Sequence, residues 1–379
     1  MTERTILISA GEASSDMYAA RLATALRSRT GAHLFGMGGP RMAEAGVELI
    51  ADSREVAVVG LTEALTKISS VLRVQRRLAR EASERRPSLA ILVDSPGTHM
   101  GVARRLKAIG VPVGYFIGPQ IWAWRPGRIR TIKRLVQHMV VIFPFEEKIY
   151  RDAGVPADFV GHPLVDLVRP TMNRSEFTAR YGLDAGRPIV ALLPGSRRNE
   201  VARNLKPILA ACERLVRGTK TNGEAQFVLA AAPGLDMSAF TANTGRPGVD
   251  VTHVEGVTYD ALAAADCAVV ASGTATVEAA LLGTPMVVVY RLAPSSAFIL
   301  RRMIRVPFFS MVNLIAERRV VPELIQDDFT PAALEAEVRS LLGSSSAHEE
   351  MRVGLAGVRA KLGPGGAIER AADIFVRML

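Results

Sequence analysis

Short apolar runs alternate with amphipathic stretches of helical length along the chain. The runs that we interpret as buried strands are residues 6–9, 89–93, 113–117, 139–143, 189–193, 226–231, 251–255, 267–271 and 286–290. Between them, segments such as 17–28, 61–83 and 201–214 have the periodicity of amphipathic helices. Continuous Val, Ile and Leu runs separated by helices are typical of parallel strands that are covered on both faces. The pattern therefore predicts an α/β fold with parallel sheets.

The alternation breaks between Gly161 and Pro170, where glycine and prolines cluster. We expect a domain boundary there, with one doubly wound sheet in residues 1–168 and a second in 169–362. A terminal helix follows the hinge-like segment 363–366, and we expect it to pack on the first domain or on that of a partner chain in a homodimer. Ligands of such sheets bind at the carboxyl ends of the strands, so the two domains are expected to face each other across a cleft.

Charge and cysteine content indicate the kind of partner and the cellular compartment of the protein. The chain has 379 residues, with 47 Lys+Arg against 37 Asp+Glu, and the resulting charge of +10 favours an anionic partner. Solvated arginine-rich helix faces would explain the same excess. Cys212 and Cys267 lie in apolar segments and fit a reducing compartment rather than a disulfide framework. No secretory leader or uncharged run of about 18–20 residues is visible, so we expect a cytosolic protein.

Two polar segments follow predicted strands of the first domain. The segment Gly11-Glu12-Ala13-Ser14-Ser15-Asp16 opens a helix, whose free N–H groups attract anions, although an ordinary helix cap explains the same residues. Asp94 ends the strand 89–93, where partial desolvation can raise the pKa of a carboxyl group toward that of a useful general base. A turn-forming aspartate before Ser-Pro is the structural alternative.

Two loops of the second domain have the composition of phosphate-binding turns. Gly195-Ser196-Arg197 joins the strand 189–193 to a helix, and the Arg197 guanidinium can clamp a phosphate. The segment Ser272-Gly273-Thr274-Ala275-Thr276 follows the strand 267–271, with Glu278 one helical turn beyond Thr274. A capped helix with an exposed glutamate is the alternative for this loop. Two such loops in one sheet favour a diphosphate site, where Glu278 accepts hydrogen bonds from a ribose.

Other chemistries lack their usual motifs. The chain has no Asp-x-Asp pair, no Cys-x-x-Cys and no His-x-x-x-His, and in the glycine-rich string 36–39 the following Pro40 breaks the dinucleotide-binding pattern. We therefore expect no metal and no nicotinamide cofactor. A departing diphosphate would be stabilised by helix N-termini, Arg197 and hydroxyl groups instead.

Three segments mix bulky apolar residues with arginines, as peripheral membrane surfaces do. They are residues 57–77, 121–128 and 298–309. Core packing explains any one of them; together they favour a surface that lies on an anionic membrane. The residues that we expect there are Leu61, Leu65, Ile68, Arg301 and Arg302.

At these motifs the chain resembles the lipid-A-disaccharide synthases, glycosyltransferases of GT-B fold from the Gram-negative outer-membrane pathway. The segments that carry the resemblance are 11–16, 93–96, 118–125 (Gly-Pro-Gln-Ile-Trp-Ala-Trp-Arg), 143–146, 160–164, 193–197, 271–278, Asn313 and 322–326. They cover essentially the whole chain in order. One departure is Ser15, where the family is expected to have glycine; a positive φ there would strain a serine.

The resemblance implies an inverting transfer of 2,3-diacylglucosamine from its UDP donor to 2,3-diacylglucosamine 1-phosphate (lipid X), on the cytoplasmic face of the inner membrane. Asp94 is the expected base and Arg197 the residue that stabilises the leaving group. The expected donor contacts are Gly195, Ser196, Arg197, Ser272, Gly273, Thr274, Thr276, Glu278, Asn313 and Gln326. The expected acceptor side of the cleft comprises Glu12, Ser14, Asp16, Gln120, Trp122 and His162.

Two other functions remain open from the sequence. A UDP-sugar epimerase of the same architecture would need the UDP loops but no acyl-binding surface. A non-catalytic nucleotide-sugar or nucleic-acid binder would explain the positive charge. With only 6% aromatic residues, the chain lacks the basic and stacking pattern of nucleic-acid sites, so we expect no nucleic-acid partner.

Overall fold

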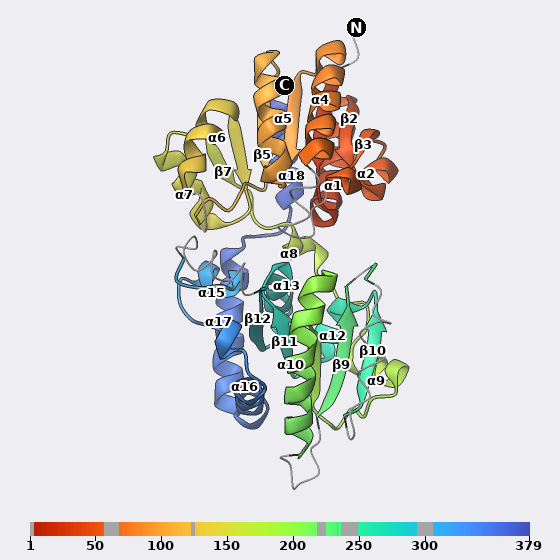
Figure 1. The fold of residues 1–379 in the computed structure, drawn as a ribbon, viewed down its shortest axis with the longest axis vertical. Coiled ribbons are helices and arrows are strands. Elements are labelled where there is room, and N and C mark those ends of the chain that lie inside the picture. The colour runs from red at the N-terminus through yellow and green to blue at the C-terminus, as the bar shows by residue number, and fades with distance from the viewer. Residues whose placement is uncertain are drawn as a thin grey trace. The chain divides into compact units, whose positions relative to one another are not determined.

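A computed structural model describes residues 4–56, 68–122, 126–217, 225–232, 234–235, 249–293 and 306–379. The chain divides into two compact units, and each has a parallel sheet of its own (Figure 1). The first unit consists of Met1–Pro163 together with Leu362–Leu379, and the second of Leu164–Lys361.

The first unit contains a seven-stranded parallel sheet in the order β3-β2-β1-β4-β5-β6-β7. Its strands are β1 Thr5–Ala10, β2 His33–Gly38, β3 Glu48–Asp52, β4 Leu89–Val93, β5 Val113–Phe116, β6 His138–Val141 and β7 Ala157–Phe159. Both faces of the central strands are buried, which explains their continuous apolar sequences.

Helices cover both faces of this sheet. They are α1 Ala13–Thr30, α2 Pro40–Glu44, η1 Ser53–Glu55, α4 Ile68–Arg85, α5 Pro96–Ala108, η2 Pro126–Arg128, α6 Ile129–Leu135, α7 Pro144–Asp152 and α18 Ala367–Arg377. One core joins apolar residues of α4, α5, α6 and α7 to alternate strand residues such as Leu7 and Leu92. On the sheet's other face, Gly114 of β5 leaves room for Phe375 of α18, whose ring carbon lies 2.6 Å from the position a Cβ would take.

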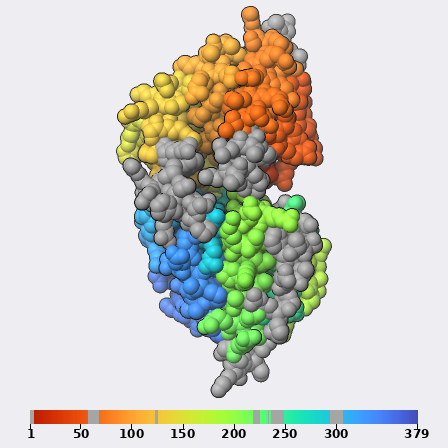
Figure 2. Space-filling view, viewed as in Figure 1, coloured from red at the N-terminus to blue at the C-terminus, as the bar shows by residue number. Residues whose placement is uncertain are grey.

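The second unit contains a six-stranded parallel sheet in the order β10-β9-β8-β11-β12-β13. Its strands are β8 Ile189–Leu193, β9 Gln226–Ala231, β10 Val251–Glu255, β11 Cys267–Ala271, β12 Met286–Tyr290 and β13 Glu323–Ile325. Its helices are α8 Leu164–Leu167, α9 Arg174–Tyr181, α10 Arg198–Arg217, α12 Thr258–Ala264, α13 Thr274–Leu282, α15 Met311–Ala316, η3 Gln326–Asp328, α16 Pro331–Gly343 and α17 Ser345–Lys361. The outer side of α10 is at the surface of this unit (Figure 2).

The division between the units falls a few residues before the boundary expected from the sequence. The short helix α8 already packs on α13 of the second unit, so the chain changes unit at Leu164. The terminal helix α18 packs on α1 of its own chain. Arg29 of α1 forms ion pairs with Glu369 at 2.5 Å and Asp373 at 3.0 Å, which join the two helices.

The expected apolar strands are present, and the predicted parallel α/β class is confirmed. Two of them end earlier than their apolar runs: Ile117 after β5 has a φ of 61°, and Phe143 after β6 is the N-cap of α7. Strands β2, β3, β7 and β13 were not predicted, because β3, β7 and β13 are short or carry charges and β2 contains glycines. Of the predicted helix at 61–83, residues 61–67 lie outside the described part of the chain.

Candidate functional site

Two of the predicted segments meet at the carboxyl ends of the central strands of the first sheet. Ala10 of β1 pairs with Val93 of β4, so the chain leaves the two parallel strands side by side at Gly11 and Asp94. A Cβ at Gly11 would lie 2.7 Å from Oγ of Ser95, so only glycine permits this approach. The structure therefore brings the start of α1 next to Asp94.

Asp94 has the environment of a general base. Its side chain is half-buried, and its backbone adopts φ 51°, followed by φ 48° at Ser95. Burial, and to a lesser extent the negative charge of Glu12, raise the pKa of Asp94 to about 6 against the opposing effect of a hydrogen bond from the Ser95 backbone. Two consecutive non-glycine residues in the left-handed region are strained, and such strain is typical of functional sites.

The predicted residues at the start of α1 have different roles. Glu12 and Ser14 are exposed at this edge. The Asp16 carboxylate instead accepts hydrogen bonds from the N–H groups of Gly39 (2.7 Å) and Arg41 (3.2 Å), so Asp16 caps α2. Ser15 does not have a positive φ, and its hydroxyl bonds the backbone of Glu12. The serine in the place of the expected glycine therefore leaves the loop unstrained.

The loop after β5 is held by a residue that sequence reasoning missed. The indole N–H of Trp122 donates to Oε1 of Glu146 at 3.1 Å, and the backbone N–H of Phe143 donates to Oε2 of Glu146 at 3.3 Å. Burial raises the pKa of Glu146 to about 7, against the effect of these hydrogen bonds. Gln120 is exposed in the same loop. The sequence signal was a glutamate three residues after the N-cap of α7, the capping-box position.

His162 is buried, and its ring lies 5.3 Å from that of Phe143. Its backbone N–H donates to the carbonyl of Leu362, where the chain returns to the first unit. Burial lowers the pKa of His162 to about 3, so the imidazole is neutral at physiological pH. A buried neutral ring contributes to packing and supplies no charge to a ligand.

In the second unit, adjacent strands β8 and β11 bring the two phosphate-type loops together. Leu193 pairs with Val270, so Gly195-Ser196-Arg197 and Ser272-Gly273-Thr274 leave the sheet at neighbouring points. Arg197 is about half exposed, and its Nη1 lies 3.1 Å from Oε1 of Glu200. Oε2 of Glu200 accepts hydrogen bonds from the backbone N–H groups of Ser196 and Arg197. These donors are the kind that bind anions at a helix N-terminus.

The start of α13 shows which of its polar groups face outward. Gly273 and Thr274 are exposed, whereas the buried Thr276 hydroxyl donates to the carbonyl of Gly273 at 2.8 Å. The Ser272 hydroxyl donates to the carbonyl of Phe309 at 3.1 Å. Glu278 accepts a hydrogen bond from the Tyr259 hydroxyl at 3.2 Å, and burial raises its pKa.

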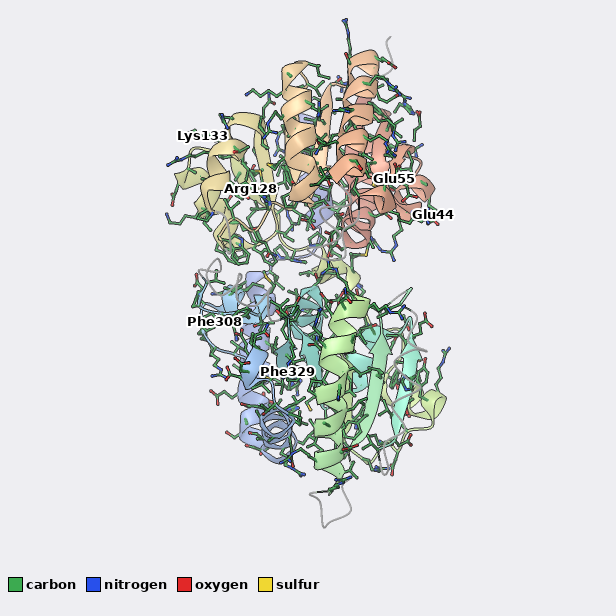
Figure 3. The ribbon with its side chains drawn as sticks, in the orientation of Figure 1. Glu44, Glu55, Arg128, Lys133, Phe308 and Phe329 are labelled. Atoms are coloured by element: carbon green, nitrogen blue, oxygen red, sulfur yellow. The ribbon has the colours of Figure 1, made fainter. Side chains whose placement is uncertain are left out.

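Asn313 and Gln326 differ in what their side chains do. The Asn313 amide is buried; it donates to Val321 and Glu323 and accepts from the backbone N–H groups of Val320 and Val321. It therefore holds the loop before β13. Gln326, with φ 57°, directly follows β13 at the carboxyl edge of the sheet. Its carbonyl accepts from Arg291, whose guanidinium lies 5.2 Å above the ring of Phe329 (labelled in Figure 3).

The expected membrane residues Leu61, Leu65, Arg301 and Arg302 lie outside the described residues. Ile68 and Leu72 of α4 are described and are exposed, at 51% and 38%. Within the described ranges, no helix is both long and apolar enough to span a membrane. The same ranges contain no group of three or more His, Cys, Asp or Glu residues arranged to bind a metal ion.

Solved structures with low sequence identity share the fold. A UDP-GlcNAc 2-epimerase from Neisseria meningitidis bound to UDP-GlcNAc matches with a TM-score of 0.68 and 12% identity, over 98% of this chain and 100% of that one. The calicheamicin glycosyltransferase matches with a TM-score of 0.60 and 15% identity, over 100% and 99% of the two chains. The fold is thus the GT-B-like fold that the resemblance implied.

Sequence comparisons identify the family. A family model described as lipid-A-disaccharide synthetase matches residues 6–365. The lipid-A-disaccharide synthase of Myxococcus xanthus is 46% identical over 375 residues, which are 99% of this chain and 97% of the relative. That of Geobacter sulfurreducens is 45% identical, over 100% and 99% of the two chains. The resemblance is confirmed: the chain belongs to the lipid-A-disaccharide synthase family.

Proposed function

We propose that this protein transfers 2,3-diacylglucosamine from its UDP donor to the 6-hydroxyl group of lipid X. The products are the β-1,6-linked disaccharide 1-phosphate and UDP. The observation that carries the proposal is the position of Asp94 at the carboxyl end of the central strand β4. Its side chain is half-buried, its pKa is raised and its backbone is strained. Family membership supports the substrates. Mass spectrometry of a reaction with both lipids tests it.

In the proposed step, the acceptor oxygen attacks the anomeric carbon of the donor from the face opposite to UDP. The bond from that carbon to the diphosphate oxygen breaks, and the configuration inverts. The proton of the hydroxyl passes to the Asp94 carboxylate. A pKa of about 6 leaves Asp94 largely ionised at neutral pH and basic enough to accept the proton. Positioning of the two substrates supplies much of the remaining acceleration.

The donor's diphosphate would bind at the start of α10, beside the Ser272–Thr274 loop. Arg197 and the N–H groups of Ser196 and Arg197 are the donors there, and they are engaged by Glu200 in this structure. Diphosphate binding would exchange these contacts for stronger charge-assisted ones. Glu278 would accept hydrogen bonds from the ribose, and Gln326 would contact the donor from the end of β13.

Acyl chains would lie against an apolar surface that includes Ile68 and Leu72 at the exposed start of α4. Arg73 and Arg76, also exposed on α4, would face anionic headgroups. The expected location is the cytoplasmic face of the inner membrane, and the basic-apolar segment with Arg301 and Arg302 would add to the contact. A homodimer is compatible with this arrangement.

An epimerase is not favoured. The epimerase matches at 12% identity establish only the fold, whereas the synthase relatives at 46% and 45% cover nearly the whole chain. A nucleotide-sugar binder without catalysis gives no reason for the strained, partly desolvated carboxylate of Asp94.

A further inference from the structure

The backbone at Asp94 needs support, because neither Asp94 nor Ser95 is a glycine and both have a left-handed φ, of 51° and 48°. The carbonyl oxygen of Asp94 is held by two side chains. The Tyr115 hydroxyl donates to it at 2.6 Å, and Nδ1 of His99 lies 2.7 Å from it. A carbonyl oxygen has two lone pairs, so both are used.

The hydrogen bonds determine the tautomer of His99. A carbonyl only accepts, so Nδ1 carries the hydrogen and Nε2 must itself accept. Nε2 lies 2.9 Å from the hydroxyl of Ser9, which donates to it. Ser9, His99 and Tyr115 are all completely buried. The neutral ring is favoured by burial, which lowers the pKa of His99 to about 4.

The three side chains come from three different elements around the end of β4. Ser9 of β1 and Tyr115 of β5 are both register partners of Leu92, one on each side of β4. His99 lies one turn into α5, and its backbone N–H bonds the carbonyl of Ser95. The rings of His99 and Tyr115 meet edge to face, with centroids 6.3 Å apart.

We propose that His99, oriented by Ser9, is a positioning residue that holds the Asp94 backbone in the conformation that directs its carboxylate toward the acceptor hydroxyl. The proposal rests on the function proposed above. His99 contacts the main-chain carbonyl of Asp94, so it acts on where the carboxylate points and supplies no charge to the substrates. Losing it therefore lowers turnover and leaves substrate binding nearly unchanged.

Two amide variants separate this role from simple core packing. In His99→Asn the side-chain amide nitrogen takes about the place of Nδ1 and can still donate to the Asp94 carbonyl. In His99→Gln it takes about the place of Nε2, so the donor to Asp94 is lost. Both variants place an amide in the same buried position. His348→Gln is a matched control, since Nε2 of His348 meets the carbonyl of Asp266 at 3.1 Å in the second unit.

We would measure kcat, KM for both substrates, UDP affinity and the melting temperature of each full-length variant. His99→Asn is expected to keep kcat within about 3-fold, and His99→Gln to lower it by at least about 10-fold with KM and UDP affinity within about 3-fold. His348→Gln leaves kcat unchanged. Equal loss of kcat in both His99 variants, in step with their melting temperatures, or no loss in His99→Gln, overturns the proposal.

Crystal structures of the two variants give a readout that does not depend on turnover. The positive φ of Asp94 is expected to persist in His99→Asn and to be lost in His99→Gln. If φ stays positive in His99→Gln, the positioning role is wrong even where kcat falls. If the wild-type protein forms no disaccharide, the proposed function fails, and the backbone comparison still decides whether His99 holds Asp94.

Discussion

Nη1 of Arg197 lies 3.1 Å from Oε1 of Glu200, and the second carboxylate oxygen of Glu200 accepts hydrogen bonds from the N–H groups of Ser196 and Arg197. A carboxylate of the chain itself therefore engages the donors that the start of α10 offers to an anion. A diphosphate at the proposed donor site would take the place of the Glu200 carboxylate on these donors.

Replacing Arg197 with glutamine should weaken UDP binding, because the variant loses the charged group that is proposed to contact the diphosphate. Loss of a charge-assisted hydrogen bond, which contributes about 1.5–3 kcal/mol, should raise the Kd for UDP roughly 10- to 100-fold. Calorimetry measures this Kd. Arg198→Gln is the control, since Arg198 is the exposed neighbour at the first position of α10. Equal affinities for UDP in wild type and Arg197→Gln would remove Arg197 from the donor site.

Asp94→Asn should abolish most of the turnover while UDP-sugar affinity stays the same. Loss of a general base lowers kcat by about 10²–10⁴-fold, because the amide cannot accept the proton of the acceptor hydroxyl. Asp152→Asn, which removes an exposed carboxylate paired with Lys148, should leave kcat unchanged. An unaltered kcat in Asp94→Asn would exclude Asp94 as the base.

The pH dependence follows from the raised pKa of Asp94. The base works only when it is ionised, so kcat/KM should rise with pH, with an inflection near the pKa of about 6, and level off above it. The negative charge of Glu12 contributes to that raised pKa, so Glu12→Gln should move the inflection to lower pH. A pH–rate profile of the two proteins decides; an inflection that does not move would show that Glu12 does not act on the base.

The proposed membrane contact makes a prediction for residues 301 and 302. Reversing two positive charges in Arg301→Glu with Arg302→Glu should weaken binding to vesicles that contain anionic lipid, because each basic residue near such a surface contributes about 1 kcal/mol. Sedimentation with anionic and with zwitterionic vesicles measures the effect. The same bound fraction in wild type and variant would place the membrane contact elsewhere.

Whether the role of a residue could be predicted from the sequence depends on whether its contacts are local or distant in the chain. Apolar runs such as Leu89–Val93 predicted the strands because burial on both faces of a parallel sheet leaves a continuous hydrophobic pattern. The ends of these strands then indicated Asp94 and the loop at Gly195. The sequence did not predict which loops lie beside them, because no single segment of the chain determines the order of the strands in the sheet.

The roles of residues whose partners are distant in the chain could not be predicted from the sequence. Asp16 looked like a site residue, but its carboxylate caps a helix that begins 24 positions later, at Pro40. Glu146 entered the sequence analysis only as part of the segment 143–146, and its hydrogen bond with Trp122 became visible only when β5 and β6 brought the two residues together. His99 gave no sequence signal, because its partners Ser9 and Asp94 lie on separate strands.

The central claim is the reaction itself, and mass spectrometry of a mixture of the purified protein, UDP-2,3-diacylglucosamine, lipid X and EDTA tests it most directly. We predict the disaccharide 1-phosphate and UDP as products, formed at the same rate with and without the chelator. A protein that binds UDP but forms no disaccharide from these lipids, and instead converts UDP-N-acetylglucosamine to its epimer, would contradict the account.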